Sequence, residues 1–301
     1  MMMFSFRRSV LPGAAVAALL LLASAPQALA ASPGLHAEEI VRFPSQDADL
    51  TDGAPTTLTG RFLRPAGTGP YPTVVLLHGC SGLYTKGGRV SARHLDWALT
   101  LRDQGYAVLM VDSFGPRGID QVCTRNERSI RATVERKRDA WAALAYLRDR
   151  RRDVDNDRIA VMGWSQGAGT VLAAYGPGSK ESGKGSGFRA AVAFYPGCGK
   201  PLKDQSWQPE GPLLMLLGGK DEWTPAEKCM ELASREPVKE RTEVVVYPEA
   251  HHGFDSPASP LRKRTNLATA PNGEATVGTN ESARKDAIAR VSAFLAQELK
   301  G

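Results

Sequence analysis

The stretch "RIAVMGWSQGAGT" (residues 158–170) decides which fold this sequence predicts. The apolar run IAVM is typical of a buried strand, and the residues after the serine are compatible with a helix. A strand, a tight G-x-S-x-G turn and a helix in direct succession form the setting in which a serine becomes an exposed nucleophile. Side chains at Gly163 or Gly167 would collide with the neighbouring strand or helix. Ser165 is therefore a candidate nucleophile, and the alternative is a residue that only caps the helix.

A serine hydroxyl needs a base to remove its proton, and the base needs an acid to orient it. The stretch "PLLMLLGGKDEWTP" places Asp221 shortly after an apolar run, with Glu222 as the alternative acid. The stretch "EVVVYPEAHHGFD" then supplies His251 and His252 after another apolar run. The order serine, acid, histidine is the one expected for a nucleophile that follows a strand. The sequence thus predicts a catalytic triad of Ser165, Asp221 and one of the two histidines.

Hydrolysis through a serine also needs N–H donors for the negatively charged oxygen of the intermediate. The backbone N–H of Gln166, directly after the nucleophile, is the first candidate. The second donor is expected in "VVLLHGCSG", where the N–H of Cys80 is preferred and that of Ser81 is the alternate. His78, at a strand end in the same stretch, is expected to order the loop instead of taking part in catalysis.

Alternating apolar runs and helical patterns predict an α/β fold with a mostly parallel sheet of about 7–8 strands and helices on both faces. Helical spacing of apolar residues occurs around residues 130–147 and 288–299. Residues 176–187 have the composition of a surface loop, and residues 256–280 are polar with turn signals. No internal repeat or second domain is indicated. The expected strands are residues 57–63, 73–77, 107–111, 159–162, 190–194, 213–217 and 243–247.

The N-terminal residues have the pattern of a secretory signal peptide. Arg7 and Arg8 precede an apolar run, and small residues that a signal peptidase reads end at Ala30. The run is shorter than the roughly 20 residues of a membrane span, so that a membrane anchor is the less favoured alternative; a twin-arginine signal is another. We expect a signal peptide over residues 1–30, a single domain over residues 31–301 without a membrane span, and a periplasmic or secreted protein.

Charge and cysteine content narrow the function classes further. The formal net charge is +6, but basic and acidic residues are interspersed, which does not indicate nucleic-acid binding. An even number of cysteines in an exported chain favours disulfides, and no Cys/His spacing typical of a metal site is present. Three pairings are possible for the four cysteines, which are Cys80, Cys123, Cys198 and Cys229.

Five ordered motifs resemble the dienelactone hydrolase family of α/β-hydrolases across about residues 55–298: "LLHGCSG", "VDSFGPRG", "GWSQGA", "LLGGKDEWTP" and "YPEAHHGF". The resemblance implies an α/β-hydrolase fold and hydrolysis of small carboxylic esters or lactones through an acyl-enzyme, without metal or organic cofactor. One departure matters: the enzymes that name the family use a cysteine nucleophile, whereas Ser165 holds that place here. Dienelactone itself is therefore in doubt as the substrate.

The resemblance also implies roles for single residues. The pattern HGF selects His252 as the base and leaves His251 as a neighbour. The two bridges implied are Cys80 with Cys123 and Cys198 with Cys229. Three further side chains are candidates for the rim of the site without a catalytic role: Arg117 to hold a substrate carboxylate or form a structural salt bridge, and Trp164 and Trp223 to line a pocket or pack in the core.

Two other functions fit the same residues. A peptidase of the same fold would use identical chemistry but usually carries an additional lid or propeller domain. A binding protein on an inactive hydrolase scaffold is the alternative from another class, and the presence of every triad member argues against it.

Overall fold

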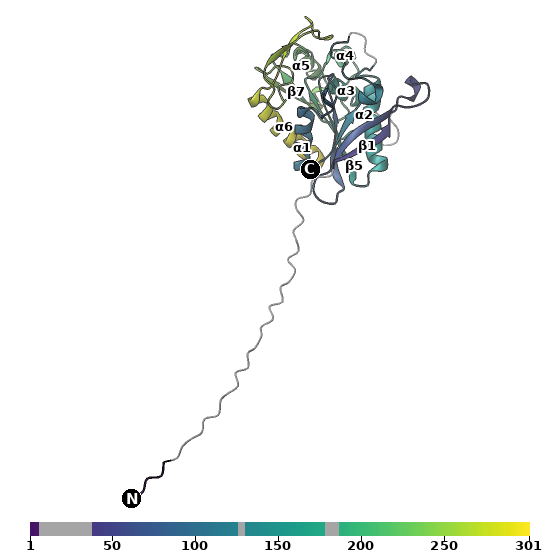
Figure 1. Ribbon diagram of the computed structural model, residues 1–301. Helices are drawn as coiled ribbons and strands as arrows, with labels where there is room; N and C mark the ends of the chain where they lie inside the picture. The colour runs from purple at the N-terminus through teal and green to yellow at the C-terminus, as the bar shows by residue number, and fades with distance from the viewer. Residues whose placement is uncertain (6–37, 126–129, 178–186) are drawn as a thin grey trace. The chain divides into compact units, whose positions relative to one another are not determined.

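The computed structural model describes residues 1–5, 38–125, 130–177 and 187–301 (Figure 1). The chain divides into two compact units, Met1–Gly34 and Leu35–Gly301. The first unit contains the expected signal peptide, of which only residues 1–5 are described, and these form no regular secondary structure. Most of the expected surface loop at residues 176–187 also lies outside the described residues.

One eight-stranded sheet forms the centre of the second unit, in the order β1-β2-β4-β3-β5-β6-β7-β8. β2 pairs antiparallel with β1 and β4, and every pair from β4 to β8 is parallel. The prediction of a mostly parallel sheet is confirmed. The strands are β1 (Glu38–Pro44), β2 (Thr57–Leu63), β3 (Tyr71–Leu77), β4 (Ala107–Asp112), β5 (Val154–Trp164), β6 (Ala190–Phe194), β7 (Leu213–Gly218) and β8 (Thr242–Tyr247).

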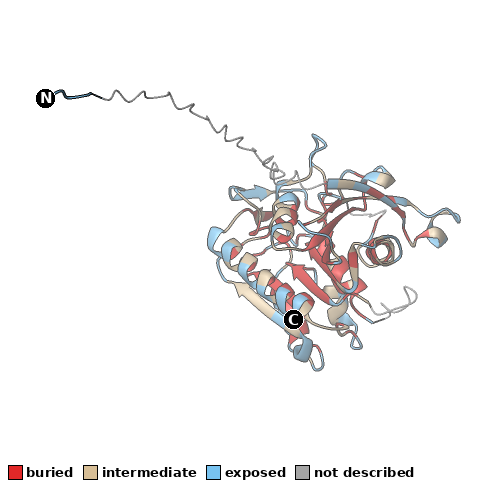
Figure 2. Cartoon of the chain, turned by 90° about the horizontal axis from the view of Figure 1, so that it is seen from below, coloured by how far each residue is buried: buried red, intermediate tan, exposed pale blue. Residues whose placement is uncertain are grey.

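Helices cover both faces of the sheet, because successive side chains of its buried strands point to opposite faces. In β3, Val75 and Leu77 belong to the apolar cluster on one face of the sheet, whereas Val74 and Leu76 belong to the cluster on the other face. Figure 2 shows the buried strands between the half-exposed helices. The helices are α1 (Ala92–Asp103), α2 (Glu135–Arg150), α3 (Gln166–Ala174), α4 (Gly199–Lys203), α5 (Glu227–Ala233) and α6 (Glu281–Lys300).

Three strands were not expected from the sequence. β1 lies at the edge of the sheet, where only Val41 and Phe43 are buried, so its apolar signal is weak. The other two, β9 (Arg262–Arg264) and β10 (Ala275–Val277), form a separate antiparallel pair within the polar segment that was expected to be a loop. In the described part of the chain, no helix combines the length and the apolar character that crossing a bilayer requires.

Candidate active site

Ser165 occupies a strained turn between β5 and α3. Its φ of 53° and ψ of −115° are rare for a residue with a side chain, and its N–H donates to the carbonyl of Phe194 over 2.9 Å. A Cβ on Gly163 would lie 2.5 Å from the carbonyl oxygen of Gly167, and one on Gly167 would lie 2.5 Å from that of His78. The two glycines therefore let the helix and two strands approach closely enough to hold the serine in this conformation.

Asp221 and His252 are brought together at the carboxyl ends of β7 and β8. The Nδ1 atom of His252 lies 2.7 Å from Oδ2 of Asp221, and both side chains are buried. The other carboxylate oxygen accepts the N–H groups of Trp223 and Thr224 over 2.8 and 2.9 Å. Burial by itself raises the pKa of Asp221, but the His252 charge and these hydrogen bonds outweigh it and lower the pKa below its usual value. Asp221 thus stays ionised at neutral pH and accepts the Nδ1 proton, which leaves Nε2 free to act as a base.

Three neighbours hold the imidazole in place. The rings of Tyr195 and Trp223 lie 4.5 and 4.7 Å from that of His252, centroid to centroid. The hydroxyl of Thr224 lies 3.2 Å from Nδ1 of His252 and 3.0 Å from both Oδ2 of Asp221 and the carbonyl oxygen of Tyr195. Sequence reasoning missed Tyr195 and Thr224. The sequence offers only their position as a hint: Tyr195 directly follows the strand that ends at Phe194, and Thr224 lies shortly after Asp221.

A second buried carboxylate, Asp255, joins the two loops that carry the serine and the histidine. It is fully buried and accepts the indole N–H groups of Trp97 and Trp164 over 2.9 and 2.7 Å and the hydroxyl of Tyr195 over 2.5 Å. The guanidinium of Arg93 lies 3.3 Å away. Trp164 directly precedes the serine, and Tyr195 packs against the imidazole. The sequence analysis did not single out Asp255, although it ends the stretch "HHGFD".

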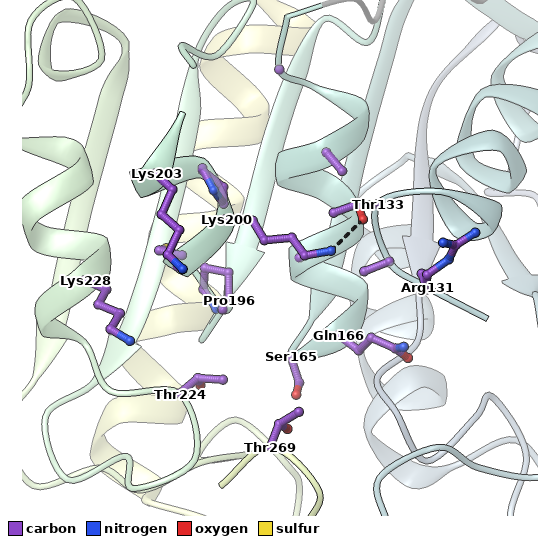
Figure 3. A pocket seen from close by; sticks show the side chains of 18 of the residues that line it. Arg131, Thr133, Ser165, Gln166, Pro196, Lys200, Lys203, Thr224, Lys228 and Thr269 are labelled. Atoms are coloured by element: carbon purple, nitrogen blue, oxygen red, sulfur yellow. Dashed lines mark hydrogen bonds between the residues drawn. The ribbon is translucent and has the colours of Figure 1, made fainter. Parts of the chain in front are cut away.

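An open cavity of about 730 Å³ extends over Ser165. Figure 3 shows Ser165 at one end of this cavity with Thr224 and Thr269 nearby. Trp223 and Thr224, which contact His252, line the same cavity as the serine. Among the described residues the Ser165 hydroxyl has no hydrogen-bond partner. The volume is within the range of small-molecule sites.

Both residues expected to supply N–H donors line the same cavity as the serine. Gln166 is the first residue of α3, so its N–H has no carbonyl partner within the helix, and Cys80 lines the same cavity. Behind them the buried guanidinium of Arg136 donates to the Gln166 side chain over 3.1 Å and to the carbonyl of His78 over 2.7 Å. Burial lowers the pKa of Arg136 to about 10, so it remains charged at neutral pH. One cation thus braces both segments that carry the candidate donors.

His78 is buried at the end of β3, and both of its ring nitrogens contact backbone groups. Its Nδ1 lies 2.8 Å from the carbonyl oxygen of Gly79, and its Nε2 accepts the N–H of Ser113 over 3.3 Å. Burial, followed by the Arg136 charge, lowers the pKa of His78 well below its usual value. The neutral ring donates from Nδ1 to the Gly79 carbonyl and accepts the Ser113 N–H at Nε2. These two contacts order the loop, which is the role expected from the sequence.

Arg117 forms a structural ion-pair cluster. Its guanidinium binds both carboxylate oxygens of Asp139, over 2.8 and 2.9 Å, and one of Asp47 over 2.7 Å. A further N–H donates to the carbonyl of Ser113. Of the two roles considered from the sequence, the salt bridge is the one that the structure contains.

The residues that were alternatives in the sequence analysis take no part in the contact between His252 and Asp221. Glu222 is exposed and accepts the N–H of Thr276 over 2.7 Å, whereas its neighbour Asp221 contacts the histidine. His251 is half-buried, and its Nδ1 has no hydrogen-bond partner among the described residues. Ser81 is exposed, with its hydroxyl 3.2 Å from the sulfur of Cys123.

The β9–β10 pair and the segment between its strands cover one side of the site. Val277 of β10 forms an isolated bridge with His252, and the N–H of Ala268 donates to the carbonyl of Cys123 over 2.9 Å. Thr269 from the same segment lines the cavity. The stretch expected to be a loop therefore builds part of the wall around the serine.

Both disulfides lie at this edge of the sheet. Cys80 pairs with Cys123 after the adjacent strands β3 and β4, and Cys198 pairs with Cys229 after the adjacent strands β6 and β7. These are the two bridges that the resemblance implied. One anchors a candidate oxyanion donor, and the other connects the residue before α4 to α5.

A mostly parallel eight-stranded sheet, helices on both faces and a serine in a strained turn after a central strand define an α/β-hydrolase. The chain belongs to the dienelactone hydrolase family, whose model matches residues 58–299. It is thus a carboxylic-ester hydrolase. No curated protein matches the chain.

Solved structures share the fold at low sequence identity. A dienelactone hydrolase-like promiscuous phosphotriesterase from metagenomic libraries is 21% identical, with a TM-score of 0.56 over 87% of this chain and 99% of that one. An esterase of Pyrococcus furiosus is 17% identical, with a TM-score of 0.56 over 88% and 93%. Dipeptidyl peptidase 4 of Porphyromonas gingivalis is 17% identical, with a TM-score of 0.60 over 88% of this chain but only 36% of that one. These similarities concern the fold alone.

Proposed function

We propose that this protein is an exported serine hydrolase that cleaves carboxylic esters or lactones through a Ser165–His252–Asp221 triad and an acyl-enzyme. Two observations support the proposal. One is the strained serine between β5 and α3, and the other is the buried His252 whose Nδ1 is held by an ionised aspartate. Trp223 and Thr224 contact this histidine and line the same cavity as the serine. Membership of the dienelactone hydrolase family supports the ester or lactone substrate.

In the proposed reaction, Nε2 of His252 takes the proton of Ser165 as the serine oxygen attacks the ester carbonyl. The N–H groups of Gln166 and Cys80 stabilise the resulting oxyanion. When the tetrahedral intermediate collapses, the carbon–oxygen bond to the alcohol breaks and His252 returns the proton to the leaving alcohol. Water then attacks the acyl-enzyme with the same proton transfers, which releases the acid and restores the serine.

A covalent probe tests the nucleophile directly. We expect a fluorophosphonate probe to label Ser165 and to abolish turnover of p-nitrophenyl butyrate. Ser165→Ala should lose both labelling and turnover, the latter by on the order of 10⁶-fold as for other serine nucleophiles, with an unchanged circular dichroism spectrum. Failure of the probe to react with the folded wild-type protein would favour a binding protein on the same scaffold.

Export rests on the residues at the start of the chain and on the two disulfides, which persist in oxidising compartments. Intact mass of the protein recovered from the periplasm or culture medium should correspond to a chain that begins at Ala31. A full-length chain retained in the cytoplasm would contradict this part of the proposal.

A further inference from the structure

The cavity over the serine continues as a groove along α3. Three residues of α3 line it at spacings of three and four, which places them on one helix face: Gln166, Gly169 and Ala173. Gly176, just beyond the end of α3, lines it as well. At 1.5 Å per residue, the stretch from Gln166 to Ala173 corresponds to about 10 Å. The groove is therefore long enough for a substrate to extend well beyond the reacting carbonyl.

The described residues that line this groove carry an excess of positive charge. Five of them are cations and one, Asp204, is an acid that accepts the N–H and hydroxyl of Ser206. The cations are Arg131, Lys137, Lys200, Lys203 and Lys228.

Among the described residues, none of the four lysines forms an ion pair, whereas Arg131 pairs with Glu135. Lys200 donates to the hydroxyl of Thr133 across the groove, and the amino group of Lys137 lies 4.6 Å from the centroid of the Trp141 ring. Lys203 and Lys228 have neither an ion pair nor a hydrogen-bond partner among these residues. Figure 3 shows the amino groups of Lys200, Lys203 and Lys228 pointing into the space beyond the serine.

The Cys198–Cys229 disulfide connects the elements that carry these lysines. Cys198 directly precedes α4, which bears Lys200 and Lys203, and Cys229 follows Lys228 in α5. The three amino groups are thus presented from two covalently linked helices at one wall. Clefts lined by one sign of charge concentrate ligands of the opposite sign.

We propose that the substrates are elongated esters that carry a carboxylate remote from the scissile bond, with the anionic end lying along α3 toward Lys203 and Lys228. This inference rests on the proposed function and specifies its substrate class. A neutral ester gains nothing from these cations, whereas a carboxylate at the far end of the groove meets the amino groups of Lys203 and Lys228, which form no ion pair with any described residue. A carboxylate close to the reacting carbonyl does not extend to this wall.

The test uses mono-p-nitrophenyl esters of the dicarboxylic acids with four, six and ten carbons. Each is compared with its neutral analogue, in which the far carboxylate is a methyl amide. We expect kcat/KM to favour the anionic ester by about fivefold at ten carbons and by less at four, because each exposed charge pair contributes modestly. The preference should decline in 0.5 M NaCl.

A second experiment determines whether the preferred carboxylate belongs to the acyl part or to the alcohol part of the ester. Phenyl butyrate is compared with 4-(carboxymethyl)phenyl butyrate, in which the carboxylate is on the alcohol part, by titrating the released acid. A preference confined to the acyl series assigns the groove to the acyl chain, and one confined to the alcohol series assigns it to the leaving group. Either outcome supports the proposal, and no preference in both series overturns it.

Charge reversal identifies the residues involved. Lys203→Glu and Lys228→Glu should each lower the anionic preference about fivefold while leaving turnover of the neutral esters unchanged. The matched control is Lys285→Glu, because Lys285 is an exposed lysine of α6 that does not line the cavity and forms no ion pair among the described residues. If the variants keep the wild-type preference, the inference is wrong, while labelling of Ser165 and turnover of neutral esters would leave the proposed function intact.

Discussion

At the residue scale, the site depends on side chains that do not react themselves. Asp255 is the main example, because one buried carboxylate receives hydrogen bonds from Trp164 beside the serine and from Tyr195 beside the imidazole. The loops that carry Ser165 and His252 are thereby tied to a common acceptor.

Asp255→Asn should lower kcat more than it raises KM, because the amide weakens the hold on Trp164 and Tyr195 and removes the partner of the Arg93 charge. We expect a loss of about 2–4 kcal/mol in the free energy of unfolding as well. The rate of fluorophosphonate labelling at a temperature where the variant stays folded separates positioning from unfolding. Asp286→Asn is the matched control, since Asp286 also binds a tyrosine hydroxyl and an arginine but lies on α6. Equal effects of both variants on labelling would exclude a positioning role.

The choice between the two adjacent histidines is testable in the same way. His252→Ala should reduce kcat/KM for p-nitrophenyl butyrate by at least about 10⁴-fold, because His252 is the only base that contacts Asp221 among the described residues. His251→Ala should change it by less than about threefold. A reversed order of the two effects would move the base to His251.

At the element scale, the Cys80–Cys123 disulfide is in contact with the segment between β9 and β10. Cys80 carries a candidate oxyanion donor, while the carbonyl of Cys123 receives the N–H of Ala268 from the segment that covers the cavity. Leu267 and Ala270 pack in the same apolar cluster as both cysteines. The bridge thus fixes the oxyanion loop and one wall together.

Cys80→Ala/Cys123→Ala should lower kcat for neutral esters by about tenfold, a part of what removing an oxyanion donor costs. The bridge closes a segment of 43 residues, so its loss should also reduce the free energy of unfolding by roughly 4 kcal/mol. The matched variant Cys198→Ala/Cys229→Ala should lose similar stability but retain kcat on neutral esters. Urea unfolding and steady-state kinetics on both variants decide whether the two bridges differ in this way.

At the scale of the whole molecule, the Arg117 cluster joins distant parts of the chain. Asp47 precedes β2, Arg117 follows β4, and Asp139 belongs to α2. Both carboxylates are buried, and one guanidinium forms an ion pair with each of them. The cluster therefore holds the antiparallel edge of the sheet against a helix.

Arg117→Ala should reduce the free energy of unfolding at pH 7 by about 3 kcal/mol, because it leaves two buried carboxylates without their partner. Arg102→Ala, which removes a surface pair with Asp103, should cost less than about 0.5 kcal/mol. Urea unfolding of the two variants measures the difference.

The same cluster predicts how stability changes with acid. Burial by itself raises the pKa of Asp47, but hydrogen bonds from Thr56 and Arg117 lower it below its usual value in the folded state. The stability that Asp47 contributes is therefore present above its unfolded pKa of about 4 and is lost as the pH falls through the lower folded value. Unfolding free energies at pH 7, 5 and 3 should be similar at the first two and lower at the third. If the free energy of unfolding already declines between pH 7 and 5, a titratable group other than Asp47 dominates the pH dependence of stability.

The sheet was largely predictable because buried strands leave continuous apolar runs. The runs at residues 57–63 and 190–194 coincide with β2 and β6, and the helical pattern from residue 130 begins as a helix at Glu135. β1 was missed because half of an edge strand faces solvent and its composition resembles a loop. β9 and β10 were missed because three-residue strands are too short to show a period.

Seven of the eight strands of the central sheet, the tight turn at Ser165 and the order of serine, aspartate and histidine could be read from the sequence alone, because they depend on local patterns and on residue types a few positions apart. Three other features became visible only in the folded chain: Asp255 links two loops, Arg117 pairs with Asp47 and Asp139, and lysines of two helices line one groove. Such contacts join residues separated by tens of positions. Their partners are selected by how the helices and loops pack on the sheet, which no local pattern encodes.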